Sequence, residues 1–273
     1  SSSAALNVVV VHPMAKVAVI VGAASKHDQD GQDDTLPPSS RYGLGGALAL
    51  RFAQDFHVVL FGRRTNVLEM VAAEVKNCGG AASVATCDVE DDKSVKAAFD
   101  LARSLGTIEV VIFNVAPPFP AGKDFSSLPQ PEEIDPEYFT RAFNIGVTGC
   151  VRCVREIIPE MLERQRGTLL LSGATMSLRG GPNFSCMAPV KAALRSLGQS
   201  MFQCYAPKGV HVCHVVLDGV IASPNTKGWA SKVMLQDPAE LADAFAMIHE
   251  QKRTAWSHEL QLTPHGESVG QRL

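Results

Sequence analysis

The chain has 273 residues, of which 46% are hydrophobic and 19% are charged, and its formal net charge is −3. This length suits one large hydrophobic core, so we expect a single domain over residues 14–273, after an N-terminal extension at 1–13. A slightly acidic chain argues against nucleic acid as a partner, because binding a phosphate backbone needs a basic surface. The apolar runs are too short to span a membrane, so no membrane association is expected.

Seven cysteines are scattered through apolar segments, and this odd number predicts free thiols in a reducing, cytoplasmic compartment. Cys150 and Cys153 have C-x-x-C spacing, but no second Cys/His pair accompanies them, so no metal site is predicted. The final residues, Gln271-Arg272-Leu273, only partly match the Ser-Lys-Leu signal for peroxisomes.

From Lys16 onward, short apolar runs alternate with amphipathic stretches. The apolar runs predict strands at residues 17–21, 58–61, 82–85, 110–113, 169–171 and 210–217. Apolar residues repeated every three or four positions predict helices at residues 44–56, 66–78, 92–105, 138–164 (with a break) and 189–203. Continuously apolar strands separated by helices indicate a parallel sheet covered on both faces. The fold class is therefore α/β, a three-layer Rossmann-type doubly wound sheet of about seven mostly parallel strands.

Two segments interrupt this alternation and are predicted to be loops. Residues 25–40 are polar and rich in Pro, Gly and Asp, and residues 116–136 are rich in proline. The first segment separates the first strand from its helix, and we interpret it as an insertion in a phosphate-binding loop. Loop-closure entropy makes such an insertion cost on the order of 2 kcal/mol, which a domain of this size tolerates.

Glycines flank this insertion in an order typical of a dinucleotide-binding turn. The residues concerned are Gly22 and Ala23 at the strand end, and Tyr42, Gly43, Leu44 and Gly45 at the start of the helix. Glycine lets the backbone approach a pyrophosphate, and a helix N-terminus offers free N–H groups and its positive dipole end to that phosphate. In the alternative interpretation these glycines merely turn the chain.

The second strand ends in Gly62-Arg63-Arg64. An acidic residue at this strand end binds the adenine-ribose hydroxyls of NAD, whereas Arg pairs with the 2′-phosphate of NADP. With Gly62 at the acidic position and Arg63 and Arg64 following, we predict NADP(H) in preference to NAD(H). The alternative is two solvated arginines on a turn.

These features, with two motifs farther along, resemble the short-chain dehydrogenase/reductase family over essentially the whole chain from Lys16. Cys87-Asp88-Val89 resembles its adenine-side Asp motif, and Asn114-Val115-Ala116 resembles its Asn-Asn-Ala-Gly segment. The resemblance implies that Asp88, Val89, Asn114, Val115 and Ala116 bind the cofactor. It extends this role to Gly219 and Ile221, which follow the sixth strand.

The family uses a Ser that polarises the substrate carbonyl, and a Tyr four residues before a Lys that holds the nicotinamide ribose. Here Lys191 is present, but Met187 and Ala174 occupy the Tyr and Ser positions, and Gly146 stands where a supporting Asn is usual. None of the three tyrosines falls near the required place in the sequence. The catalytic candidates are therefore Lys191 and the neighbouring hydroxyl of Ser172.

Other groups are candidate replacements, with packing or structural hydrogen bonding as the favoured alternative for each. They are Thr175, Ser185, Cys186, His214 and His258. The segments Gly173-Ala174-Thr175 and Asp218-Gly219 resemble a divergent subgroup of the family, in which the usual Ser and Tyr are also replaced.

The resemblance implies an atypical NADP(H)-dependent oxidoreductase that acts on a small carbonyl or alcohol substrate. The alternative is a non-catalytic NAD(P)-binding module, such as a sensor or partner subunit. The family also implies a homodimer or homotetramer, formed through the helices at 138–164 and 189–203.

Overall fold

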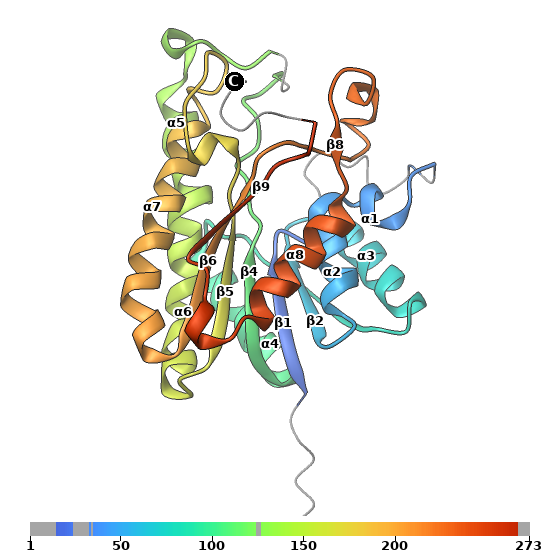
Figure 1. Ribbon diagram of the computed structural model, residues 1–273, viewed down its shortest axis with the longest axis vertical. Coiled ribbons are helices and arrows are strands. Elements are labelled where there is room, and N and C mark those ends of the chain that lie inside the picture. The colour runs from blue at the N-terminus through green and yellow to red at the C-terminus, as the bar shows by residue number, and fades with distance from the viewer. Residues whose placement is uncertain (1–14, 24–32, 34, 124–126, 267–273) are drawn as a thin grey trace, which may run out of the picture.

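The structure is a computed structural model that describes residues 15–23, 33, 35–123 and 127–266. Within these residues a seven-stranded sheet, parallel throughout, forms the middle layer (Figure 1). Its strands are β1 (Lys16–Val21), β2 (His57–Gly62), β3 (Ala81–Thr86), β4 (Thr107–Phe113), β5 (Gly167–Ser172), β6 (Val210–Leu217) and β9 (Glu259–Leu262). Their order is β3-β2-β1-β4-β5-β6-β9, which confirms the predicted doubly wound α/β sheet.

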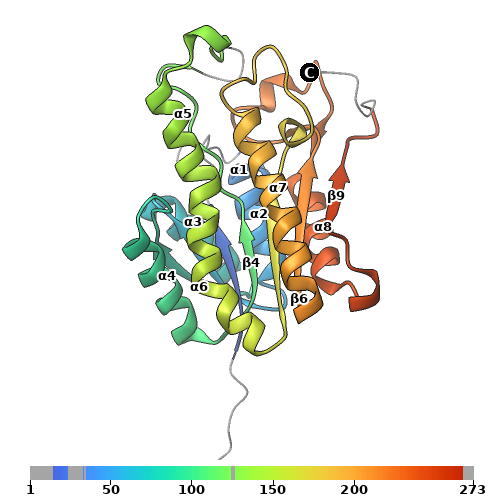
Figure 2. The same cartoon turned by 90° about the vertical axis from the view of Figure 1, so that its left-hand side faces the viewer.

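Helices cover both faces of the sheet (Figures 1 and 2). One face carries α2 (Gly43–Phe52), α3 (Thr65–Asn77) and α8 (Pro238–Glu250), and the other carries α4 (Asp92–Leu105), α6 (Gly149–Glu163) and α7 (Ala188–Tyr205). Two shorter helices, α1 (Pro38–Arg41) and α5 (Pro136–Phe143), precede α2 and α6. Beside the main sheet, β7 (Val220–Ile221) pairs with β8 (Leu235–Gln236).

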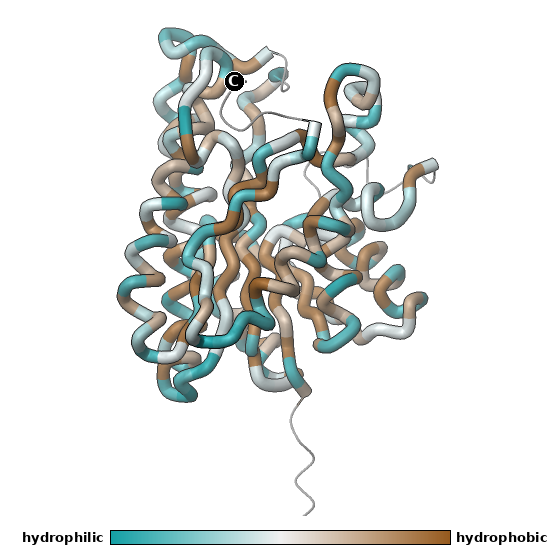
Figure 3. Tube along the Cα trace, in the orientation of Figure 1, coloured by the Kyte–Doolittle hydropathy of each residue, from teal (hydrophilic) through white to brown (hydrophobic). Residues whose placement is uncertain are grey.

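Alternation along each strand divides the core between the two faces. Val17, Val19 and Val21 pack beneath α4, α6 and α7, whereas Ala18 and Ile20 pack beneath α2, α3 and α8. The central strands are therefore apolar on both sides. In Figure 3 the tube is brown along these strands, whereas along the helices it alternates between polar and apolar residues. None of the helices in the described part of the chain is long and apolar enough to cross a membrane.

The order of connections changes direction at the carboxyl ends of β1 and β4. From β1 the chain moves outward through β2 to β3, and then crosses to β4 on the other side of β1. The connection after β1 therefore leads to one side of the sheet and the connection after β4 to the other. In doubly wound sheets, ligands bind where two neighbouring connections diverge in this way.

The six predicted strands agree with the structure to within a few residues at each end, and the break in the 138–164 helix is confirmed. A π-helical turn at Asn144–Thr148 separates α5 from α6. The helix predicted at 44–56 is shorter in the structure: α2 ends at Phe52, and residues 53–55 form a turn. The prediction of an uninterrupted loop at 25–40 was wrong at its end, where Pro38 starts α1; residues 25–32 and 34 lie outside the described part. In the described part of the loop predicted at 116–136, Pro131–Glu133 forms a 3-10 turn, and the prediction was wrong at its last residue because Pro136 begins α5.

Candidate functional site

The residues predicted to bind a cofactor lie at or just beyond the carboxyl ends of the strands. Gly22 follows β1, Arg63 follows β2, Asp88 follows β3 and Asn114 follows β4. Parallel strands bring their carboxyl ends to one edge of the sheet, so residues distant in sequence meet there. These residues therefore lie at the edge of the sheet where the connections diverge.

The glycine turn closes despite the insertion. Gly22 has a φ of 86°, in the left-handed region, and its N–H donates to the Phe61 carbonyl at 2.9 Å. A Cβ on Gly45 would lie 2.5 Å from the Gly22 oxygen and 2.6 Å from the carbonyl carbon of Ala23. The first turn of α2 thus packs directly on the end of β1, and only glycine fits at position 45.

The side chains around this turn are buried in the core or hydrogen-bonded to the backbone. Tyr42 and Leu44 are buried against α2 and β1, so only their backbone faces the turn. Gly43 has a φ of 58°, which lets the chain change direction between α1 and α2. The Asn114 side chain donates to the Gly22 carbonyl at 3.0 Å and so joins the ends of β1 and β4. The free N–H groups at the start of α2 lie beside this junction.

The insertion is tied to a second segment where it rejoins the described chain. The Asp33 carboxylate pairs with Lys227, from the segment between β7 and β8, and this hydrogen bond lowers the pKa of Asp33. Arg41 donates to the carbonyls of Asp33 and Leu36, at 3.1 Å each. The insertion therefore ends in a fixed position beside the loop that follows β6.

At the end of β2, Arg63 is exposed and Arg64 is half-buried. The Asp88 carboxylate accepts the Glu90 N–H at 3.0 Å, so it stabilises its own turn. Val89 is buried against Gly149, where an added Cβ would lie 2.9 Å from the Val89 side chain.

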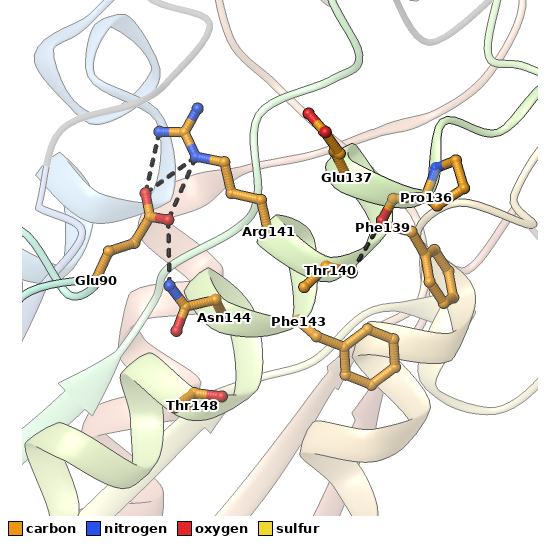
Figure 4. Close-up of a pocket in the computed structure, with 9 residues that line it drawn as sticks. All are labelled: Glu90, Pro136, Glu137, Phe139, Thr140, Arg141, Phe143, Asn144 and Thr148. Carbon is orange, nitrogen blue, oxygen red and sulfur yellow. Dashed lines mark hydrogen bonds and ion pairs between the residues drawn. The ribbon is translucent and has the colours of Figure 1, made fainter.

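Glu90 lines an open hollow of about 880 Å³ against α5 and the π turn (Figure 4). Burial alone would raise the pKa of Glu90, but hydrogen bonds from Arg141 and Asn144 lower it overall. Arg152 donates in turn to the Asn144 side chain at 3.0 Å. The Asn144 side chain is therefore hydrogen-bonded to Glu90 and Arg152 at this hollow, and it does not replace the supporting Asn that is usual at position 146.

Lys191 is the buried cation of the site. It lies in the first turn of α7, is 7% exposed, and donates from Nζ to the Ser172 carbonyl at 2.9 Å. Burial lowers its pKa from 10.5 to about 8. The Ser172 hydroxyl, by contrast, is buried and has no hydrogen-bond partner among the described residues. The structure thus joins Lys191 to the backbone of Ser172 and not to its hydroxyl.

An apolar cluster, which we call the Met187 cluster, surrounds the residue that the sequence predicts at the family's Tyr position. It consists of Leu128, Phe184, Cys186, Met187 and Ala188. Tyr138 from α5 packs against it and donates its hydroxyl to the Pro118 carbonyl at 3.0 Å. Burial and the Cys186 thiol raise the pKa of Tyr138, so this hydroxyl stays protonated. A tyrosine does lie near Met187 in space, which the sequence could not show because Tyr138 comes from a different helix.

Beyond β6, Gly219 is confined by its neighbours, because a Cβ there would lie 2.8 Å from Pro264 and 3.0 Å from Gln236. Ile221 is half-buried in β7. The Asp218 carboxylate accepts hydrogen bonds from Gln261 at 2.7 Å and Thr263 at 3.1 Å. The end of β6 is therefore fixed against the segment that follows β9.

Known proteins share this sequence pattern and this fold. The family model for short chain dehydrogenases matches residues 40–233. A 2-dehydro-3-deoxy-L-rhamnonate dehydrogenase (NAD(+)) from Sphingomonas sp. is 29% identical, over 67% of this chain and 69% of that protein. A protein from Xanthobacter autotrophicus, described as inactive 2-(S)-hydroxypropyl-CoM dehydrogenase 2, is 32% identical over 61% of this chain and 67% of its own. The crystal structure of a short-chain dehydrogenase from Rhodopseudomonas palustris superposes with a TM-score of 0.72 at 25% identity, covering 92% of this chain and 99% of that one.

Proposed function

The chain belongs to the short-chain dehydrogenase family, and we propose that it is an NADP(H)-dependent oxidoreductase acting on a small carbonyl or alcohol substrate. The observation that carries this proposal is the buried ammonium of Lys191 at the edge where Gly22, Gly45 and Asn114 meet. A buried lysine with a lowered pKa is costly to keep, so its retention points to a ligand that uses it.

The residues at this edge fit a dinucleotide. Glycine at positions 22 and 45 brings the end of β1 against the start of α2, where backbone N–H groups and the helix dipole favour an anion such as a pyrophosphate. Lys191 has three N–H donors, and the Ser172 carbonyl takes one of them. Ribose hydroxyls are suitable acceptors for the other two.

When bound, the cofactor supplies or accepts a hydride, which is the chemistry of its nicotinamide ring. The chain's own residues bind and orient it: Gly22 and Gly45 at the pyrophosphate, and Lys191 at the nicotinamide ribose. Neither Met187 nor Ala174 exchanges a proton, so we propose that water delivers the proton at this site. Losing a positioned general acid lowers a rate by about 10²–10⁴-fold, which leaves a slow enzyme.

The preference for NADP(H) rests on Arg63, which is exposed at the end of β2 with Gly62 in place of an acidic residue. A guanidinium there suits a 2′-phosphate. The Sphingomonas relative is named for NAD(+), so cofactor choice needs its own measurement.

A second candidate function is a non-catalytic NAD(P)-binding module. The Met187 cluster favours it, because apolar side chains fill the position of the usual proton donor. The Xanthobacter relative described as inactive is consistent with loss of activity within the family. For either function we propose a homo-oligomer formed through α6 and α7, which size-exclusion chromatography with light scattering would test.

The test is steady-state absorbance at the nicotinamide band, with NADPH or NADH and a panel of aldehydes and ketones. We expect slow, substrate-dependent oxidation of NADPH that the Lys191→Ala variant abolishes. If NADPH binds and no carbonyl compound oxidises it, the binding module is the correct function. If neither nucleotide binds, both proposals are wrong.

A further inference from the structure

Arg179 carries a set of unused hydrogen-bond donors at the carboxyl edge of the sheet. It lies in the segment between β5 and α7, and its side chain is 28% exposed. Its one polar contact with the described residues is an ion pair with Asp218, in which Nη2 lies 3.9 Å from Oδ1. That separation is too long for a hydrogen bond, so the guanidinium N–H groups have no acceptor in the described part of the chain.

A second arginine at the same edge shows the contrast with a satisfied guanidinium. Arg195, on α7, is 33% exposed and donates to both oxygens of Glu259, at 2.6 and 2.8 Å. Asp218 already accepts two other hydrogen bonds through Oδ2. It therefore attracts Arg179 by charge and leaves the N–H groups of that guanidinium for another acceptor.

The donors that a ligand can reach are those of the two Nη atoms of Arg179. Nε is covered by the protein and has no hydrogen-bond partner in the described part of the chain. The Nη atoms also lack a hydrogen bond there, but they are not covered, so they belong to the exposed part of the side chain. A planar guanidinium with unused N–H groups matches the geometry of a carboxylate.

The place of Arg179 in the fold connects it with the proposed cofactor site. Its segment begins after Ser172, whose carbonyl accepts the hydrogen bond from Lys191. The 3-10 turn that precedes Arg179 packs on α7 and β6. Its partner Asp218 is the first residue after β6 and directly precedes Gly219, which the sequence predicts to bind the cofactor. Arg179 therefore lies at the sheet edge that carries Lys191.

The charged groups at this edge leave one positive charge without a partner. Each of the two arginines is balanced by one carboxylate. Lys191 donates to a carbonyl, and no carboxylate pairs with it among the described residues. His214, whose Nδ1 lies 3.2 Å from Glu259, adds no charge at pH 7, because burial lowers its pKa to about 4. An anionic ligand at Arg179 would therefore balance the charge at this edge.

We propose that Arg179 is a specificity-determining residue that binds a carboxylate group of the substrate through its Nη atoms, while Asp218 holds the guanidinium in place. The substrate class is then a small oxo acid or hydroxy acid, in preference to an uncharged carbonyl compound or alcohol. This substrate class rests on the proposed function, whereas binding of a carboxylate at Arg179 needs no nucleotide.

The test is an NMR titration of the protein without nucleotide, labelled with ¹⁵N in arginine, against benzoylformate and its methyl ester. Because Nε of Arg179 is covered, its N–H should exchange slowly with water and give a resolved signal, identified by its loss in Arg179→Lys. We expect benzoylformate to shift this signal and to bind at least about tenfold more tightly than the ester, which lacks the negative charge.

Arg179→Gln should remove the difference in affinity between the acid and the ester, and Arg179→Lys, which keeps the charge, should retain part of it. The matched control is Arg155→Gln, which removes the same charge from an exposed position on α6 and should leave the difference unchanged. Equal affinities for the acid and the ester in the unmodified protein would overturn the proposal, as would equal effects of Arg179→Gln and Arg155→Gln.

The Nε signal of the unmodified protein decides the matter even if Arg179→Gln does not fold. A signal that benzoylformate leaves unshifted would overturn the proposal, because the acid would then bind elsewhere or not at all. Since no nucleotide is present, this outcome is separate from failure of the proposed function, which the NADPH experiments decide.

Discussion

Replacing Lys191 with methionine should stabilise the protein while removing its function. Burial lowers the pKa of Lys191 from 10.5 to about 8, and one unit corresponds to 1.36 kcal/mol, so keeping the ammonium charged at pH 7 costs about 3 kcal/mol of folding free energy. Methionine keeps most of the alkyl volume and loses the bond to the Ser172 carbonyl, worth about 1 kcal/mol. The net gain for Lys191→Met is therefore about 2 kcal/mol.

The sign of this effect depends on pH in a defined way. Between pH 8 and 10.5 the unfolded chain binds more protons at Lys191 than the folded protein does, so the unmodified protein gains stability as pH rises through that window. The advantage of Lys191→Met should be complete below pH 8 and disappear by about pH 10.5. Urea unfolding at several pH values measures it, and at pH 7 the Tm should rise by about 4–8 °C. Lys252→Met, at an exposed position, is the control. A Lys191→Met protein that is less stable than the unmodified protein at pH 7 would refute the reasoning.

Three further predictions concern the turn, the cofactor and acid. Gly45→Ala should abolish nucleotide binding and destabilise the fold by about 2 kcal/mol or more, because its Cβ would overlap the carbonyls of Gly22 and Ala23. Gly228→Ala is the control and should do neither, because no atom lies within 4 Å of its Cβ. Calorimetry compares nucleotide binding by the two variants, and urea unfolding compares their stability. Arg63→Ala should raise the Kd for NADPH about tenfold or more and leave that for NADH nearly unchanged, and an equal effect on both would disprove the 2′-phosphate contact. His214, with its pKa lowered from 6.5 to about 4, should make the protein lose about 2 kcal/mol of stability between pH 7 and 5, a loss that His214→Gln reduces; equal pH slopes in both proteins would contradict this.

The fold could be predicted from sequence because its strands are apolar on both faces and are separated by regular helices. Apart from α1, the α-helices and strands that were not predicted come after β6: they are β7, β8, α8 and β9. β9 has four half-buried residues with polar ones among them, so it lacks the apolar run that marked the other strands. α8 has signals that apolar periodicity does not include: Asp237 is an N-cap whose side chain accepts the Ala239 N–H, and Pro238 stands in the first turn.

The site was only partly predictable, because some of its contacts join residues that are distant in the sequence. Gly22, Gly45 and Lys191 carry local signals, because a tight turn or a helix position dictates the residue type. The environments of Met187 and His214 depend on partners from other elements, Tyr138 in one case and Glu259 in the other. Sequence spacing does not report such contacts, so the Met187 cluster and the contact between His214 and Glu259 needed the structure.

The most direct test of the account is calorimetric titration of the protein with NADPH. We predict saturable binding with a stoichiometry of about one per chain, lost in Gly45→Ala, weakened at least about tenfold in Lys191→Met and unchanged in Gly228→Ala. Absence of binding by both NADPH and NADH to the folded, unmodified protein would contradict the claim that the edge from Gly22 to Lys191 is a dinucleotide site.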